Sequence, residues 1–242
     1  MLLFVGLGNP GLKYAHNRHN LGFMALNELA RRYQFPAARQ RFKSRFQEGQ
    51  IAGQRVLLQK PETFMNESGR AVGEALRFFK LAASDVTVFY DDLDLKPGKV
   101  KIKYGGGAGG HNGLRSLDAH IGSDYRRVRI GIGHPGSKDA VLRYVLDDFA
   151  KIEQAGWLAD LIPGIAGEIE ALVTGDDGRF MSRLAHIVFP PPLKPPKSTA
   201  RGTATVPAAA TKAATSKTPD TDTALSAALA RAGHLNKPID ED

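Results

Sequence analysis

The sequence contains no cysteine among its 242 residues, which excludes disulfide bonds and thiolate chemistry. It also lacks any apolar run close to the ~20 residues that span a membrane, and its N-terminus enters a predicted strand without the features of a signal peptide. We therefore expect a cytoplasmic protein with no membrane contact. No aromatic residue follows Phe189, which predicts that the last part of the chain builds no core.

The composition changes abruptly at Pro190. Five of residues 190–196 are prolines, and Ala, Thr, Lys and Pro dominate the rest of the chain. Such a segment buries too little apolar surface to offset the entropy lost on ordering it. The sequence therefore predicts one folded domain over residues 1–189, followed by a disordered Pro/Ala/Thr/Lys-rich tail over residues 190–242.

The folded part alternates predicted strands and helices, which is typical of an α/β fold. The predicted strands are 2–5, 46–51, 55–59, 86–90, 100–104 and 127–132, and the predicted helices are 20–33, 68–80, 113–121, 139–146 and 151–173. Pro163 is expected to kink or break the last helix. Because a short hairpin joins two of the strands and helices join others, we expect a twisted, mixed sheet covered by helices.

The chain carries 33 basic and 25 acidic residues, a formal net charge of +8. Seven of the basic and five of the acidic residues follow Phe189, so residues 1–189 carry 26 and 20, a net charge of +6. Basic side chains cluster near residues 39–45, 99–103 and 126–129. Such clusters favour a polyanionic partner such as a nucleic acid, although an ordinary solvated surface would also contain them.

Three glycines after the first strand, Gly6, Gly8 and Gly11, have the spacing of a dinucleotide-binding turn. Pro10 interrupts that motif, because proline offers no N–H to a phosphate and disfavours helical angles at Asn9. The helical pattern begins well after the motif, and no carboxylate ends the following strand, as a nicotinamide site would require. We therefore rank a nicotinamide enzyme low and expect a polar loop at the end of the first strand.

Four loops that follow predicted strands carry polar side chains, over residues 9–19, 61–69, 90–94 and 105–113. Ligands of open α/β folds bind at the carboxyl ends of strands, so we expect one edge of the sheet to gather these loops. His19 could act there as a general base, because imidazole titrates near neutral pH, and Asp91 could orient it. Alternatively, the two are a surface histidine and a turn aspartate.

Asn9, Asn66 and Asn112 could supply neutral donors and acceptors to a polar substrate or an oxyanion. Each also has a structural alternative, because Asn66 and Asn112 could cap helices and Asn9 could form a turn. The glycine-rich residues 105–110 are either a flexible connector or a close approach of backbone to ligand. Lys103 and Arg129 could hold phosphates.

Other catalytic chemistries find little support. The chain has no G-x-S-x-G motif for a nucleophilic serine. His16 and His19 are three residues apart, without an H-E-x-x-H context or an evident third ligand, so we expect no metal site. The remaining polar residues suit direct attack by an activated water.

Five motifs follow one another along the chain. They are Val5-Gly6-Leu7-Gly8-Asn9-Pro10-Gly11 with Tyr14 and Arg18-His19-Asn20; Lys60-Pro61 with Thr63-Phe64-Met65-Asn66 and Ser68-Gly69; Asp91-Asp92-Leu93-Asp94; Gly105 to Leu114; and Arg129-Ile130-Gly131-Ile132-Gly133-His134-Pro135. Bacterial-type peptidyl-tRNA hydrolases carry such motifs in this order, and the chain resembles this family over about residues 1–190.

The resemblance implies hydrolysis of the ester that joins a peptide to the 3′ ribose of tRNA, in peptidyl-tRNA that ribosomes release prematurely. It implies a monomer that uses no metal or organic cofactor, with tRNA as partner and contact with stalled ribosomal subunits as a further possibility. By position, His19 would be the general base, Asp91 would stabilise its reactive form, and Asn9 would separate N-blocked from free aminoacyl-tRNA. The implied substrate and tRNA contacts are Tyr14, Phe64, Met65, Asn66, Lys103, His111, Asn112 and Arg129, with Lys103 and Arg129 as a phosphate clamp.

Two positions depart from some relatives, which carry histidine where this chain has Ala108 and glutamate where it has Asp92. Neither is a position to which the family assigns catalysis, and the tail lies outside the family pattern. The rival from another class is an RNA-binding module, because some proteins of this fold resemble the enzyme yet act as RNA-splicing factors. We favour the hydrolase, since the implied catalytic set is complete.

Overall fold

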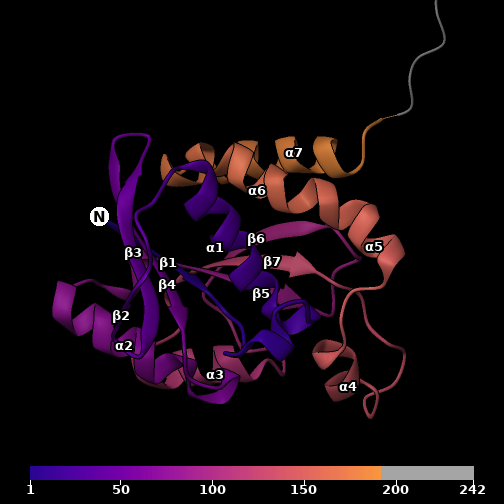
Figure 1. The fold of residues 1–242 in the computed structure, drawn as a ribbon, viewed down its shortest axis with the longest axis horizontal. Helices are drawn as coiled ribbons and strands as arrows, with labels where there is room; N and C mark the ends of the chain where they lie inside the picture. Colours follow the sequence, from indigo (N-terminus) through magenta and orange to yellow (C-terminus); the bar gives the residue numbers. More distant parts are fainter. Residues whose placement is uncertain (192–242) are drawn as a thin grey trace, which may run out of the picture. The chain divides into compact units, whose positions relative to one another are not determined.

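A seven-stranded sheet in the order β2-β3-β4-β1-β5-β7-β6 organises residues 1–191, the part of the chain that the computed structural model describes (Figure 1). The parallel strands are β1 (Leu2–Gly6), β4 (Gln54–Pro61), β5 (Val86–Asp92) and β7 (Arg126–Gly131), and the antiparallel ones are β2 (Arg39–Arg41), β3 (Ser44–Ile51) and β6 (Val100–Tyr104). The predicted mixed sheet is confirmed, including the hairpin of β3 and β4. The short edge strand β2 was not predicted.

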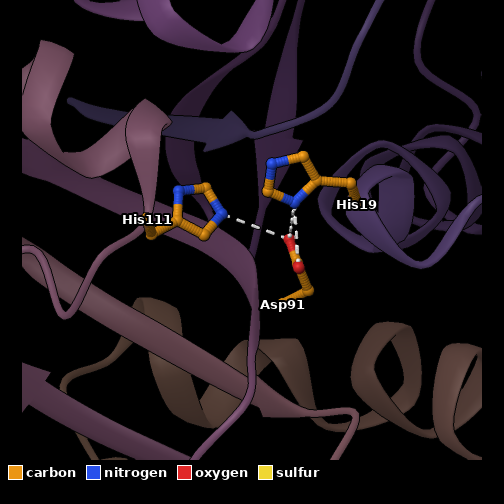
Figure 2. A group of neighbouring side chains, drawn as sticks. All are labelled: His19, Asp91 and His111. Carbon is orange, nitrogen blue, oxygen red and sulfur yellow. Dashed lines mark hydrogen bonds and ion pairs between the residues drawn. The ribbon is translucent and has the colours of Figure 1, made fainter. Parts of the chain in front are cut away.

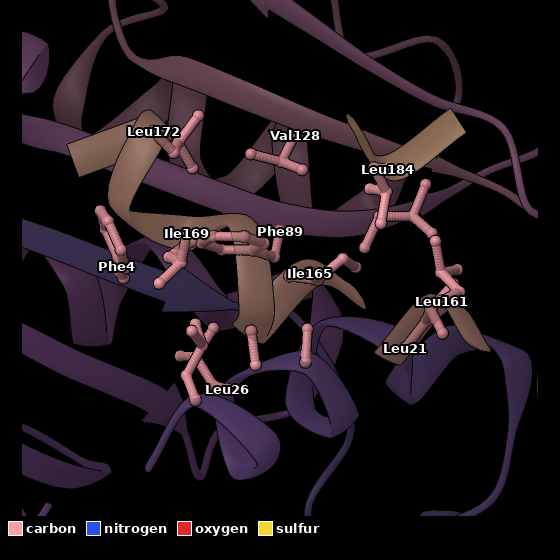
Figure 3. Close-up of a cluster of buried hydrophobic side chains, with 14 of the residues drawn as sticks. Phe4, Leu21, Leu26, Phe89, Val128, Leu161, Ile165, Ile169, Leu172 and Leu184 are labelled. Carbon is pink, nitrogen blue, oxygen red and sulfur yellow. The ribbon is translucent and has the colours of Figure 1, made fainter. Parts of the chain in front are cut away.

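Helices cover both faces of the sheet, because side chains of the central strand β1 alternate between two cores. Leu3 and Val5 pack with α2 (Ser68–Phe79) and α3 (Asn112–Ile121), whereas Phe4 packs with α1 (Leu21–Arg32), α6 (Trp157–Val173) and α7 (Asp177–Val188). Figure 3 shows the core that contains Phe4, where side chains of α6 spaced about four residues apart pack against Phe4 and Phe89.

The break in the region predicted as a helix over 151–173 falls at Gly156 and not at Pro163. Gly156 has non-helical angles (φ −102°, ψ −124°) and separates α5 (Lys151–Ala155) from α6, which continues through Pro163. An internal proline costs a helix about 3 kcal/mol. Leu161, Ile165 and Ile169 are completely buried on the sheet, and their packing outweighs that cost.

Helix α7 was not predicted, although its sequence carries signals for it. Asp176 caps its first turn by accepting a hydrogen bond from the Arg179 N–H at 2.9 Å. Phe180, Leu184 and Val188 recur every four residues and are buried. The remaining helix, α4 (Val141–Leu146), is two residues shorter at its start than predicted.

The glycine-rich loop after β6 does not leave the sheet at the edge where the sequence placed it. Because β6 is antiparallel to β7, Tyr104 pairs with Arg126 at the beginning of β7, so the loop starts at the opposite edge. Four glycines at positions 105, 106, 109 and 110 have φ between 55° and 92°, which lets the chain turn back. Arg127 donates to the Gly107 carbonyl at 2.7 Å and fixes the returning loop.

Within residues 1–191, no helix combines the length and the apolar character needed to cross a membrane. The tail was predicted to be disordered over residues 190–242, and all of it from residue 192 onward lies outside the described residues.

Candidate active site

His19 reaches the sheet through a close approach between backbone segments. It lies in a 3₁₀ turn, Arg18–Asn20, that leads directly into α1. A Cβ at Gly6 would lie 2.4 Å from the Gly22 carbonyl oxygen, and a Cβ at Gly22 would lie 2.2 Å from that of Phe89. These two glycines therefore let the start of α1 pack against β1 and β5, which gives the opening glycine motif a structural purpose without a dinucleotide.

Asp91, near the end of β5, receives His19. Nδ1 of His19 donates to the carboxylate and lies 2.9 Å from both Oδ1 and Oδ2 (Figure 2). The proton on Nδ1 leaves Nε2 of His19 as a proton acceptor. Burial lowers the pKa of His19, but the Asp91 carboxylate more than compensates and raises it above the ordinary 6.5.

A second imidazole holds the same carboxylate. Nε2 of His111 lies 3.2 Å from Asp91 Oδ1, and the two histidine rings are 4.7 Å apart (Figure 2). Nδ1 of His111 accepts hydrogen bonds from the backbone N–H groups of Gly113 and Leu114, at 3.1 and 3.4 Å, so His111 caps α3. The alternative that Asn112 caps this helix is therefore wrong.

The three side chains together decide the charge of the cluster. Burial alone would raise the pKa of Asp91, but the two imidazoles hold it well below its usual range. Burial lowers the pKa of His111, and the Asp91 carboxylate only partly opposes that shift. The cluster therefore contains an ionised carboxylate between one neutral histidine and one that titrates.

The possible ligand atoms of His19, Asp91 and His111 lie within 4.8 Å of one another, which is close enough for a shared metal ion. A metal on Nε2 of His111 would require its proton on Nδ1. That atom instead faces the N–H groups of Gly113 and Leu114, which already donate to it. The donor set therefore does not fit a metal ion.

Hydrogen bonds hold Asn9 so that its side chain offers only a donor to the cavity. Its Oδ1 accepts from the Met65 N–H at 2.9 Å, and its backbone N–H and carbonyl both bond to the side chain of Asn20, at 2.8 and 3.0 Å. The amide oxygen is thus occupied, and Nδ2 remains as a donor. Asn20 occurs in the quoted motif, but no role was predicted for it.

These groups line a cavity of about 1030 Å³. Its lining contains the predicted residues Asn9, His19, Phe64, Met65, Asn66, Asp91, Lys103, His111, Asn112 and Arg129. Tyr14 lies in the turn Leu12–Tyr14 and is not part of the lining. Neither Asn66 nor Asn112 caps a helix. Asn66 lies inside the 3₁₀ turn Met65–Glu67, whose capping position is Phe64 and carries no side-chain hydrogen bond, and His111 occupies the capping position of α3.

One wall of the cavity consists of apolar residues that were not predicted to belong to the site. They are Val141, Leu142, Val145 and Leu146 on α4. Arg18, the neighbour of His19, fixes this wall by donating to the carbonyls of Tyr144, Asp147 and Asp148 and by pairing with Glu153 at 2.7 Å. Its guanidinium also lies 4.3 Å from the centre of the Tyr144 ring.

The two basic residues of the expected phosphate clamp differ. Lys103 on β6 is exposed at the cavity. Arg129 on β7 is bound by Asp92, with Nε to Oδ2 at 2.7 Å and a second contact at 3.3 Å, and lies 3.9 Å from an oxygen of Asp94. Asp92 thus neutralises one half of the clamp, which the sequence did not indicate.

Comparisons with known proteins agree on one family. A family model described as peptidyl-tRNA hydrolase matches residues 3–190. A peptidyl-tRNA hydrolase of Parvibaculum lavamentivorans is 58% identical over 198 residues, 82% of this chain and 97% of that protein, and one of a Ruegeria species is 59% identical over 191 residues, 79% and 77%. The crystal structure of peptidyl-tRNA hydrolase from Acinetobacter baumannii is 40% identical, with a TM-score of 0.71 over 76% of this chain and 94% of that one.

Proposed function

Because the chain belongs to the peptidyl-tRNA hydrolase family and so hydrolyses peptidyl-tRNA, we propose that His19 activates the attacking water. The observation that carries this proposal is the contact of His19 Nδ1 with both oxygens of Asp91, at 2.9 Å. It leaves the Nε2 lone pair of a buried, cavity-lining imidazole as the base. The same carboxylate stabilises the imidazolium that forms.

The reaction divides into two proton transfers. In the first, Nε2 of His19 takes a proton from water as the water oxygen attacks the carbonyl carbon of the ester, which forms a tetrahedral oxyanion. In the second, the intermediate collapses and the C–O bond to the 3′ ribose breaks, and the imidazolium returns the proton to the leaving 3′ oxygen. The products are tRNA with its 3′-hydroxyl and the peptide as its carboxylic acid, which then releases the remaining proton of the water to solvent and becomes the carboxylate.

Asn9 supports a preference for N-blocked substrates through Nδ2, the side-chain group that is not already hydrogen-bonded. Its Oδ1 is occupied by the Met65 N–H, so Nδ2 is a donor only. A donor suits the amide carbonyl of a peptidyl group, whereas the α-ammonium of a free aminoacyl group would face Nδ2 without an acceptor. Asn66 and Asn112, both exposed on the cavity lining, supply further neutral contacts to the 3′ end or the peptide.

The substrate also bears on where the protein acts, in which oligomeric state, and with which cofactors. We infer that it acts as a monomer in the cytoplasm, where ribosomes release peptidyl-tRNA, and that the reaction uses no metal or organic cofactor. Hydrolysis of peptidyl-tRNA that continues at an unchanged rate in excess chelator, by a species of monomer size in solution, is the expected result. Loss of activity that zinc or magnesium restores would contradict the metal-free reaction.

The central experiment compares His19→Ala with His16→Ala, a matched change at an exposed histidine outside the cavity lining. We expect His19→Ala to lower release of N-acetyl-aminoacyl-tRNA by about 10²–10⁴-fold, the usual contribution of a general base. Affinity for tRNA should stay near that of the wild type, and His16→Ala should keep full activity. Near-normal turnover by His19→Ala would remove His19 from the reaction, and tight RNA binding without hydrolysis by the wild type would favour the RNA-binding alternative.

A further inference from the structure

His111 carries two hydrogen bonds that fix where its proton lies. Its Nδ1 faces two donors, the N–H groups of Gly113 and Leu114, and so must be the unprotonated nitrogen. Its Nε2 then carries the proton and donates to Asp91 Oδ1 at 3.2 Å. The first turn of α3 thereby selects the tautomer of a side chain that touches the catalytic pair.

Resting on the proposed function, we propose that His111 is a positioning residue: helix α3 locks it as a donor, and it holds the Asp91 carboxylate in the orientation that keeps the His19 proton on Nδ1. The lock is stable against acid, because a second proton on the ring would have to enter the space between Nδ1 and two backbone N–H groups. The positive end of the α3 dipole also opposes that proton.

His19 and His111 compete for the Asp91 carboxylate, and this competition sets the direction in which the pKa of His19 should change when His111 is replaced. Oδ1 receives both His19 and His111, whereas Oδ2 receives His19 alone. The His111 donor thus draws off part of the negative charge that would otherwise stabilise the His19 imidazolium. Without that donor, His19 should hold its proton to higher pH.

Other groups near the two rings do not supply this effect. The Tyr90 ring packs edge-on against His111, with centroids 5.2 Å apart, and burial keeps the Tyr90 hydroxyl protonated. Asp92, the next carboxylate on β5, is engaged by Arg129. Of the groups from β5, α3 and the His19 turn, His111 is therefore the one that shares Asp91 with His19.

The test separates the two hydrogen bonds of His111 by substitution. In His111→Asn, the shorter side chain keeps an oxygen that caps α3 but does not extend to Asp91. We expect the acid limb of kcat/KM to move to higher pH by roughly 0.5–1 unit, and kcat on the plateau to fall by about tenfold, the scale of one orienting hydrogen bond. The melting temperature should stay close to that of the wild type.

Two further variants provide the controls. His111→Ala loses the cap as well, so it should show the same pH shift together with a lower melting temperature. His120→Asn makes the same replacement at the other end of α3, where His120 contacts the Ser116 carbonyl, and should leave both readouts unchanged. Nitrogen NMR of the wild type should report His111 with a bare Nδ1 and a protonated Nε2 throughout the active pH range.

The outcomes also separate this role from the proposed function. An acid limb that stays in place in His111→Asn, with only KM raised, would make His111 a substrate contact and overturn the positioning role, while an inactive His19→Ala would still support the base. Full activity of His19→Ala would instead overturn the proposed function itself. A protonated Nδ1 on His111 would contradict the tautomer lock directly.

Discussion

The two ends of the candidate active-site cavity are built on opposite principles. At the histidine end, Asp91, His19 and His111 have almost no exposed side-chain surface and bond to one another. At the basic end, Lys103 is exposed and Arg129 is partly exposed. Charges in a buried cluster interact through a weakly screening medium, whereas exposed charges are screened by water and salt.

This difference teaches what each end controls. The buried end fixes proton positions and orientations, so changes there should act on kcat and on the pH profile. The exposed end offers charge without fixed geometry, so changes there should act on affinity for tRNA and on its salt dependence. A substitution that acts on the wrong quantity would break the comparison.

The largest effect is expected for Asp91→Asn. We expect kcat/KM to fall by at least about a hundredfold, because the amide no longer stabilises the His19 imidazolium. In the wild type, activity should be lost as the pH falls through a His19 pKa above 6.5, since only the unprotonated ring accepts a proton. In Asp91→Asn burial remains without the carboxylate, so the acid limb should move below that value.

The control for this pH profile is Asp94→Asn, because the Asp94 carboxylate is 78% exposed. It should leave the acid limb where it is. An acid limb that rises in Asp91→Asn, or moves equally in both variants, would show that Asp91 does not set the pKa of His19.

A smaller effect is expected where the buried end meets the apolar wall. In Arg18, Nη1 contacts the carbonyls of Tyr144, Asp147 and Asp148 while Nη2 pairs with Glu153, so the single ammonium of Arg18→Lys keeps the charge but cannot hold the carbonyls and the carboxylate at once. We expect a loss of about 1–3 kcal/mol in the free energy of unfolding, from buried polar partners left unsatisfied, and a KM raised about tenfold with a smaller change in kcat. Chemical denaturation and steady-state kinetics measure the two.

Arg31→Lys is the matched change for Arg18→Lys, since Arg31 pairs with Glu28 on the exposed surface of α1. Its stability and KM should match the wild type. A fall in kcat alone for Arg18→Lys would mean that Arg18 acts on His19 rather than on the α4 wall.

At the basic end, the prediction concerns salt. Lys103→Ala should reduce the slope of log affinity for tRNA against log salt concentration by about one unit, with kcat nearly unchanged. Lys80→Ala, at the exposed residue that follows α2 and outside the cavity lining, is the comparison and should change the slope much less. Equal slopes for wild type and Lys103→Ala would place the phosphates elsewhere.

How far the sequence predicts this molecule depends on the range of the interaction. Apolar spacing located α2 to within one residue and β5 to within two, because a helix or strand in contact with a core shows its period locally. The direction of β6 depends on its pairing with β7, which no local pattern encodes. That is why the start of the glycine-rich loop was placed at the wrong edge, although residues 107–112 return to line the cavity with the other three loops, as predicted.

The site shows the same division. The resemblance supplied His19 and Asp91, and the structure brings them into contact. The cap on α3 was not predictable, because Asn112 is the better capping residue by type and the choice of His111 depends on where the returning loop meets Asp91. The pairing of Arg129 with Asp92 is equally non-local, since it joins neighbouring strands through their register.

That pairing supports the smallest predicted effect. In Asp92→Asn, Arg129 loses its bidentate partner and its charge becomes available to a phosphate. We expect affinity for tRNA to rise a few-fold, about 0.5–1 kcal/mol, and the salt slope to steepen by at most about one unit, because water and salt screen the attraction between a phosphate and the partly exposed Arg129. Arg129→Ala should flatten the slope less than Lys103→Ala, since Asp92 already cancels the charge of Arg129.

The matched control is Asp94→Asn, because the nearest carboxylate oxygen of Asp94 lies 3.9 Å from Arg129, and it should change neither the affinity nor the salt slope measurably. Weaker binding by Asp92→Asn would show that the ion pair itself orients Arg129 toward tRNA, and the basic end would then resemble the histidine end in relying on fixed geometry.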